Sequence, residues 1–281
     1  MFYLFKNFTQ MKILLNKTSL TKSLRHFSDI GFVPTMGSIH KGHLSLISKS
    51  NQSCHKTVVS IFVNPKQFNN KKDFKTYPKN IKKDLKKLTQ SKKVDFVYIP
   101  KFKDIFKNNM KPKIKLNKRD KILCAAYRKG HFEGVLDVMD KLTNIVKPNK
   151  IFMGNKDFQQ TFLVKNYLKN KYNTDVVECK TIREKNKVAL SSRNYLLSKK
   201  NLILAGKIVR KLISVKKKIK MKKNKNKYLL TVKDNFQREF KIKIDYLELR
   251  NINNLKLSNV VNTSRLFVAY YLNGVRLIDN L

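Results

Sequence analysis

The sequence predicts an α/β fold, a doubly wound parallel sheet followed by a smaller C-terminal α+β domain. Five short runs are apolar almost throughout, as expected for strands that are covered on both faces of a parallel sheet. Amphipathic helical patterns separate most of these runs, and strand–helix alternation favours right-handed crossovers within one sheet. The pattern changes after about residue 186, so the predicted domains are 1–186 and 187–281.

The predicted strands of the first domain are 30–35, 57–63, 94–100, 150–154 and 175–182. Its predicted helices are 43–54, 80–90, 132–146 and 157–170. In the third of these helices, apolar residues recur at spacings of three and four and form one stripe: Val135, Met139, Leu142 and Val146. The second domain is predicted to contain a helix at 199–219 and strands at 244–252 and 265–280, the last interrupted by a turn at Asn273-Gly274.

Composition excludes several classes of protein. Among the 281 residues, 41% are hydrophobic, which is ordinary for a globular protein, and no apolar run is long enough to span a membrane. The first residues, "MFYLFKNFTQMKILL", are interrupted by lysine and asparagine and are interpreted as a short extension, not a signal peptide. The cysteines Cys54, Cys124 and Cys179 lie too far apart in sequence for a disulfide framework or a zinc motif, which suits a reducing cytoplasm or organelle matrix.

The net charge of +45 comes from 63 lysines and arginines against 18 acidic residues. One interpretation is a nucleic-acid-binding protein, because a basic surface releases counterions from phosphates. The other is a genome biased toward lysine codons, and it is favoured because the lysines are spread along the whole chain. The densest run, 215–227, is predicted to be a solvated helix face and loop.

Polar residues cluster where the first strand meets its helix. His40 and His43 fall at this joint, where helix N–H groups attract an anion, and Gly37 and Gly42 permit close approach of the backbone to a ligand. Imidazolium rings there are suited to donate hydrogen bonds to phosphate oxygens in a transition state. Taken alone, this HxGH pattern is a weak signal.

Other strand ends carry similar clusters. Asn64, Pro65 and Gln67 follow the second strand, and the segment Gly154, Lys156, Asp157 and Gln160 follows the fourth. "LSSRN" at 190–194 offers two hydroxyls and a guanidinium, which is suited to bidentate binding of phosphate. Because the carboxyl ends of the strands in such a sheet share one edge, these clusters together predict a ligand site there.

Six longer motifs follow one another along the chain: "PTMGSIHKGH", "VVSIFVNPKQF", "RKGHFEGV", "KDFQQ", "ALSSRNYL" and "VRLIDN". In these motifs and in their order, the sequence resembles the pantothenate synthetase (pantoate–β-alanine ligase) family of the HxGH nucleotidyltransferase superfamily. The resemblance runs from about Met11 to the C-terminus and is weakest across 200–240. It implies a Rossmann-like first domain and a C-terminal domain of the lid or dimerisation type.

The resemblance implies a two-step reaction. ATP adenylates the carboxylate of (R)-pantoate and releases pyrophosphate, and the amine of β-alanine then attacks the pantoyl adenylate to give pantothenate and AMP. The resemblance also implies Mg²⁺ on the triphosphate, with unknown protein ligands, and a cytoplasmic homodimer without membrane or nucleic-acid partners. Asp84 is a candidate for indirect contact with that metal ion.

Residue roles follow from matching positions. The resemblance implies that His43 is a proton donor, that His40 holds phosphate beside it, and that Gln67 and Gln160 bind pantoate, Gln67 also lying near β-alanine. Lys156 and Arg193 are matched as further catalytic residues. The ATP-binding set is Met36, Gly37, His40, Gly42, His43, Gly154, Lys156, Asp157, Ile182, Leu190, Ser191, Ser192 and Arg193, in which Ile182 contributes a backbone contact to adenine and 190–193 close over the triphosphate.

The chain departs from the family pattern at three places. Asn155 replaces an acidic residue, Lys187-Val188 replace glycine and leucine, and Cys124-Ala125 replace "EG". The lysine is expected to stiffen a segment in which glycine permits unusual φ values.

Two alternative functions remain beside the ligase. One is a nucleic-acid-binding protein, whose affinity would fall steeply with salt. The other is another superfamily member such as a cytidylyltransferase, against which Gln67 and Gln160 argue.

Overall fold

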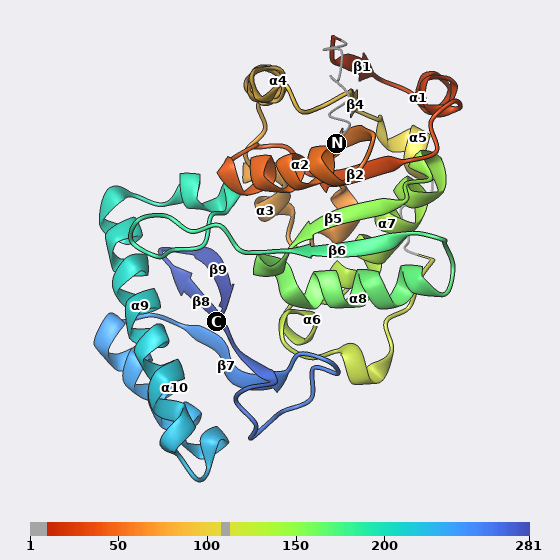
Figure 1. The fold of residues 1–281 in the computed structure, drawn as a ribbon. Coiled ribbons are helices and arrows are strands. Elements are labelled where there is room, and N and C mark those ends of the chain that lie inside the picture. Colours follow the sequence, from red (N-terminus) through yellow and green to blue (C-terminus); the bar gives the residue numbers. More distant parts are fainter. Residues whose placement is uncertain (1–9, 108–112) are drawn as a thin grey trace, which may run out of the picture. The chain divides into compact units, whose positions relative to one another are not determined.

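The computed structural model describes residues 10–107 and 113–281 (Figure 1). The chain forms two compact units, each assembled from several segments. Unit 1 comprises Met1–Lys115, Gly130–Gly154 and Thr161–Cys179, and unit 2 comprises Leu116–Lys129, Asn155–Gln160 and Lys180–Leu281. The division between residues 186 and 187 that the sequence pattern indicates stays a prediction.

Unit 1 is built on a six-stranded parallel sheet with the strand order β1-β4-β3-β2-β5-β6. The strands are β1 (Lys12–Leu14), β2 (Ile30–Thr35), β3 (Lys56–Ile61), β4 (Phe96–Tyr98), β5 (Lys150–Gly154) and β6 (Asp175–Cys179). The five predicted strands are confirmed, and so is the Rossmann-like α/β class. In β2, β3, β4 and β5 the apolar side chains are buried because helices cover the sheet (Figure 1), as the near-continuous apolar pattern requires, whereas Val176 and Val177 of the edge strand β6 are only partly buried.

The first residues of unit 1 differ from the sequence-based expectation. Lys12–Leu14 form the edge strand β1, which pairs in parallel with β4, and α1 (Lys17–Leu24) follows it. The interpretation of this stretch as a mere extension is therefore wrong for residues 12–14. A three-residue strand with two exposed side chains shows too little alternation to be predicted. Residues 1–9 of the proposed extension lie outside the described residues.

The helices that connect the strands are α2 (Lys41–Ser53), α3 (Lys71–Thr76), α4 (Ile81–Ser91), α5 (Phe102–Phe106), α7 (His131–Val146) and α8 (Phe158–Lys169). The four predicted helices correspond to α2, α4, α7 and α8, whereas α3 and α5 were not predicted. The predicted stripe of α7 is confirmed, since Val135, Met139, Leu142 and Val146 are all buried. Among the described residues, no helix is long and apolar enough to cross a membrane.

The strand order places a topological switch at β2. The chain proceeds from β2 to β3 and β4 on one side and later returns to β5 and β6 on the other. Connections therefore leave the carboxyl ends of β2 and β5 in opposite directions, and open α/β sheets bind ligands at such a point. The HxGH segment follows β2 there, and Gly154 ends β5.

Unit 2 contains an antiparallel sheet of three strands in the order β7-β8-β9, with the bounds Ile244–Asn251, Ser264–Leu272 and Val275–Asn280. Its helices are α6 (Cys124–Tyr127), α9 (Lys199–Lys218) and α10 (Lys225–Phe240). The predicted strands, helix α9 and the turn are confirmed; Asn273 and Gly274 have φ values of 47° and 78°. Helix α10 was not predicted, although Leu229, Val232 and Phe236 form a buried stripe at helical spacing.

Candidate functional site

The loop between β2 and α2 is fixed by a buried carboxylate. Gly37 and Ser38 both have positive φ values, 78° and 53°, and so turn the chain sharply after the strand. The Asp84 carboxylate, 2% exposed, accepts the N–H groups of Ser38 at 2.8 Å and Ile39 at 2.7 Å. Both carboxylate oxygens thus accept backbone N–H groups, so Asp84 anchors this loop, and its indirect contact with a metal ion stays a prediction.

This anchored loop presents the two predicted histidines together. His40 is the N-cap of α2, and its Nδ1 accepts the N–H of Gly42 at 3.1 Å, which puts the proton of the neutral ring on Nε2. The rings of His40 and His43 stack with centroids 4.0 Å apart and planes 24° from parallel. Two imidazoles at the N-terminus of a 13-residue helix form a site suited to a phosphate.

Gln67 lies in the short 3-10 helix η1 (Pro65–Gln67) that follows β3, and it is 7% exposed. Asn64 caps this turn and donates its Nδ2 to Gln67 Oε1 at 3.3 Å and to the carbonyl of Gly134 at 3.0 Å. Gln67 Nε2 in turn lies 2.7 Å from Met36 Sδ. The structure therefore brings together Met36 and Gln67, two predicted site residues that follow neighbouring strands.

Helix α7 contacts the same turn, η1, and stabilises it. Lys66 and Asp137, both with side chains only 2% exposed, form an ion pair at 2.8 Å. His131 Nδ1 donates to the carbonyl of Gln67 at 2.7 Å. A Cβ added at Gly134 would lie 2.3 Å from the carbonyl oxygen of Lys66, so only glycine permits this close approach. Sequence reasoning missed these contributions, although "RKGHFEGV" stood out as a motif.

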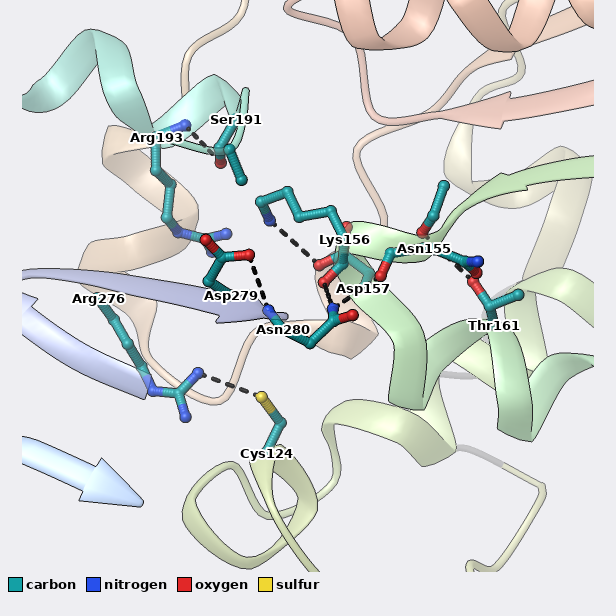
Figure 2. Close-up of polar contacts among 12 residues, drawn as sticks. Cys124, Asn155, Lys156, Asp157, Thr161, Ser191, Arg193, Arg276, Asp279 and Asn280 are labelled. Carbon is teal, nitrogen blue, oxygen red and sulfur yellow. Dashed lines mark hydrogen bonds and ion pairs between the residues drawn. The ribbon is translucent and has the colours of Figure 1, made fainter. Parts of the chain in front are cut away.

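Lys156, Asp157 and Gln160 belong to unit 2, whereas Gly154 closes β5 of unit 1. Lys156 and Asp157 lie in the 3-10 helix η3 (Asn155–Asp157) and form an ion pair at 3.3 Å (Figure 2). Gln160 is in the first turn of α8. A Cβ added at Gly154 would meet nothing within 4 Å, so the space beside this backbone is open.

The predicted closing segment follows a narrow hairpin of unit 2. Leu190 N donates to the carbonyl of Ile182 at 2.9 Å, which closes the hairpin. Ser191 begins η4 (Ser192–Leu196), and its hydroxyl accepts the N–H of Arg193 at 3.3 Å. The structure thus brings Ile182 and Leu190–Arg193 close together, while Ser192 is buried.

Cys124, one of the departures, faces a guanidinium in unit 2. Its Sγ lies 3.4 Å from an Arg276 nitrogen (Figure 2) and 3.1 Å from Tyr246 Oη. Arg276 is also paired with Asp245 at 2.9 Å. Burial and the adjacent Cys124 raise the pKa of the Tyr246 hydroxyl well above its usual value. The Tyr246 hydroxyl therefore stays protonated beside the thiol at neutral pH.

Each unit thus carries part of the predicted set. Unit 1 groups Met36, Gly37, His40, Gly42, His43 and Gln67 around the ends of β2 and β3. Unit 2 carries Lys156, Asp157, Gln160, Ile182, Leu190, Ser191, Ser192 and Arg193. Over residues 10–107 and 113–281, the structure has no group of three or more His, Cys, Asp or Glu side chains arranged to hold a metal ion.

Comparison with known proteins gives full-length matches. The family model described as pantoate-beta-alanine ligase matches residues 4–281. The pantothenate synthetase of Flavobacterium psychrophilum is 38% identical over 270 residues, covering 94% of this chain and 95% of the relative. The pantothenate synthetase of Leptospira interrogans is 41% identical over 257 residues, covering 90% of each chain.

Two solved structures extend this similarity to the fold. The crystal structure of pantothenate synthetase from Thermus thermophilus matches with a TM-score of 0.89 at 29% identity, over 96% of this chain and 99% of that chain. Pantoate-beta-alanine ligase from Francisella tularensis, crystallised with beta-gamma ATP and beta-alanine, matches with a TM-score of 0.82 at 35% identity, over 96% and 97% of the respective chains.

Proposed function

Because the chain belongs to the pantoate-beta-alanine ligase family, we propose a course for its ATP-dependent condensation of pantoate with β-alanine. A carboxylate oxygen of (R)-pantoate attacks the α-phosphorus of ATP, and the bond to the β-phosphate oxygen breaks, releasing pyrophosphate. The amine of β-alanine then attacks the acyl carbon of the pantoyl adenylate. The C–O bond to AMP breaks, the ammonium loses a proton, and pantothenate remains.

The observation that carries this proposal is the histidine pair on its anchored loop. Negative charge increases on the α-phosphate oxygens and the leaving pyrophosphate during adenylation. His40 and His43, stacked at the N-terminus of α2, are suited to donate hydrogen bonds to those oxygens as charge develops. The hydrogen bonds that Asp84 accepts from Ser38 and Ile39 fix the loop before substrates bind, so little reorganisation is needed.

Gln67 and Gln160 are proposed to bind pantoate. Glutamine amides supply neutral donors and acceptors for the hydroxyl groups of pantoate and for its carboxylate. The bonds from Asn64 and to Met36 hold the Gln67 amide in place, so it is ready for a substrate. The Francisella relative, crystallised with beta-gamma ATP and beta-alanine, supports ATP and β-alanine as the other two substrates of this chain.

The remaining predicted residues are proposed to bind the nucleotide. Lys156 and Arg193 carry the positive charge that a triphosphate needs, the backbone at Ile182 contacts adenine, and 190–193 close over the phosphates. Mg²⁺ usually takes one or two carboxylates together with substrate phosphates, and Asp157, a half-exposed carboxylate beside Lys156, fits that requirement. When bound, the ion would neutralise phosphate charge.

We also propose that the protein is a homodimer that acts in the cytoplasm. Light scattering measures the first property, and microscopy of the tagged protein in its own cell measures the second. The nucleic-acid-binding and cytidylyltransferase alternatives have no support from the matched family.

One assay of products tests the proposed function. The protein is incubated with ATP, Mg²⁺ and pantoate, with or without β-alanine, and AMP, pyrophosphate and pantothenate are quantified. We expect pyrophosphate stoichiometric with enzyme without β-alanine, and continuous AMP and pantothenate formation with it. CTP in place of ATP serves as the control nucleotide. Release of ADP and phosphate, or turnover with CTP alone, would contradict the proposal.

A further inference from the structure

Asn280, near the end of β9, connects the last strand of unit 2 to the turn that carries Lys156. Its side chain is buried, with only 5% of the residue exposed. The Nδ2 group donates to the carbonyl of Asn155 at 2.7 Å and to that of Lys156 at 3.0 Å (Figure 2). One amide group therefore holds two successive carbonyls of η3, immediately before helix α8 begins.

The orientation of this amide follows from its third partner. Arg265 donates to Asn280 Oδ1 at 2.8 Å, and a guanidinium has no acceptor, so the oxygen of the amide faces Arg265 and the nitrogen faces the carbonyls. The Arg265 guanidinium also lies over the ring of Phe158, 4.5 Å from its centroid. The turn is thus held by two strands, by Arg265 of β8 and by Asn280 of β9.

The backbone of Asn280 is fixed by a second set of bonds. Its N–H donates to Asp279 Oδ1 at 2.7 Å, and its carbonyl accepts from Arg183 at 3.2 Å. Arg183 and Asp279 form a two-point ion pair with distances of 2.7 and 2.8 Å, and Asp279 is buried. The asparagine is consequently held in one position before any ligand binds.

We propose that Asn280 is a positioning residue for nucleotide binding and adenylation. It acts through Lys156, because fixing the backbone of a long, flexible lysine limits where its ammonium group can reach. This inference rests on the role proposed above for Lys156. The proposal also assigns a role to the terminal "VRLIDN" motif, which contains none of the proposed substrate-binding residues. Small displacements of a positioned group reduce rates strongly, up to about 10²-fold for 1 Å.

The test uses Asn280→Asp in the full chain, a substitution of nearly equal shape. The carboxylate still accepts from Arg265, but it cannot donate to the carbonyls of Asn155 and Lys156 and repels them. We expect the dissociation constant for ATP, measured by calorimetry, and the KM for ATP to rise at least about tenfold. The KM for pantoate should change by less than about threefold. Asn280→Ala, which adds no charge, should likewise weaken ATP binding more than it raises the KM for pantoate. It replaces Asn280→Asp in the test if the aspartate variant does not fold.

A double-mutant cycle with Lys156→Ala distinguishes an effect of Asn280 that acts through Lys156 from a general effect of Asn280 on the stability of the protein. If Asn280 acts through Lys156, Asn280→Asp should weaken ATP binding by less than about twofold in the Lys156→Ala background. Val232→Ala, which truncates a buried side chain of α10 in the same unit, is the control for loss of stability. It should lower the melting temperature without a selective effect on ATP.

The results expected above would support the role of Asn280, and three other results would contradict it. An unchanged ATP affinity in Asn280→Asp, equal losses for ATP and pantoate, or additivity with Lys156→Ala would overturn the inference. Because ATP affinity is measured directly, this result does not depend on turnover. A parent protein that binds ATP but forms no pantothenate would instead overturn the proposed function.

Discussion

At the scale of single residues, the stacked pair of His40 and His43 is the feature most directly tied to chemistry. We predict that His43→Ala lowers the rate of adenylation by about 10²–10³, the usual effect of removing one donor that acts in the transition state. Pyrophosphate release in a single turnover measures it. His55→Ala, a change at an exposed histidine of the same unit, is the control and should leave the rate unchanged. Equal rates for the two variants would remove His43 from the mechanism.

Some site residues were predictable from the sequence because residue type and local position were sufficient. His40, His43 and Gln67 follow apolar strands, so their place at the sheet edge could be anticipated. Asp84 could not be assigned its role in this way, since its bonds reach Ser38 and Ile39 across 46 and 45 residues of sequence. The partners of Asn280 lie even farther away along the chain, 125 and 124 residues.

At the scale of elements, the close contact between α7 and η1 connects core packing to the substrate site. A Cβ at Gly134 would lie 2.3 Å from Lys66 O and 2.8 Å from Gln67 N. Gly134→Ala should therefore push the Gln67 turn away from the helix and lower the free energy of unfolding by about 1–3 kcal/mol. It should also raise the KM for pantoate more than that for ATP.

Denaturant unfolding and steady-state kinetics measure the two effects of Gly134→Ala. Val164→Ala, a truncation of a fully buried side chain in α8, is the control for destabilisation. We expect it to reduce stability without a selective rise in the KM for pantoate. If both variants change the two KM values alike, the packing of α7 does not position Gln67.

The hairpin between Ile182 and Leu190 turns at a residue with unfavourable backbone geometry. Lys187 has a φ of 74°, while its N–H donates to the carbonyl of Glu184 at 2.8 Å. This lysine is one of the departures from the family pattern, and its positive φ explains why glycine suits the position. Lys187→Gly should raise the free energy of unfolding by up to about 1 kcal/mol.

The control for this turn is Lys185→Gly, at a neighbouring position that does not have a positive φ. There the added backbone freedom should lower the free energy of unfolding by about 0.5–1 kcal/mol. Denaturant titrations compare the two variants with the parent. A loss of stability in both would mean that the turn gains nothing from glycine at position 187.

The elements that sequence patterns failed to predict are short or interrupted by lysine. Strand β1 has only three residues and α5 only five, too few to display a period. Helix α10 does contain a stripe of Leu229, Val232 and Phe236, but it begins at Lys225, inside the lysine run 215–227, whose polarity obscures where the helix begins. The long buried strands and α7 were predictable because their patterns are continuous.

At the scale of the whole molecule, the charge of +45 is the most unusual property. The predicted exposure of the run 215–227 is confirmed for most of its lysines, which include Lys217, Lys218, Lys220 and Lys223. If the charge reflects genome composition, changing these four lysines to glutamate should leave ligase activity nearly intact. Exposed substitutions usually alter stability by only about 0.5 kcal/mol.

Ionic strength distinguishes this explanation from electrostatic steering of anionic substrates. Charges separated by more than about 8–10 Å are screened near physiological salt, so kcat/KM is compared at about 20 mM and about 300 mM salt. Changing the same lysines to glutamine is the control that removes charge without reversing it. A large deficit at low salt only, graded from glutamine to glutamate, would show that the lysine run steers substrates and would overturn the genome-composition explanation.

Attack of the pantoate carboxylate on the α-phosphorus of ATP is the step on which the proposed mechanism depends. The most direct measurement uses pantoate labelled with ¹⁸O in both carboxylate oxygens, with ATP, Mg²⁺ and β-alanine, followed by mass spectrometry of the products. We expect one ¹⁸O in the phosphate of AMP and the other in the new amide carbonyl of pantothenate, because the acyl C–O bond breaks in the second step. Unlabelled AMP, or ¹⁸O in inorganic phosphate released together with ADP, would contradict this mechanism.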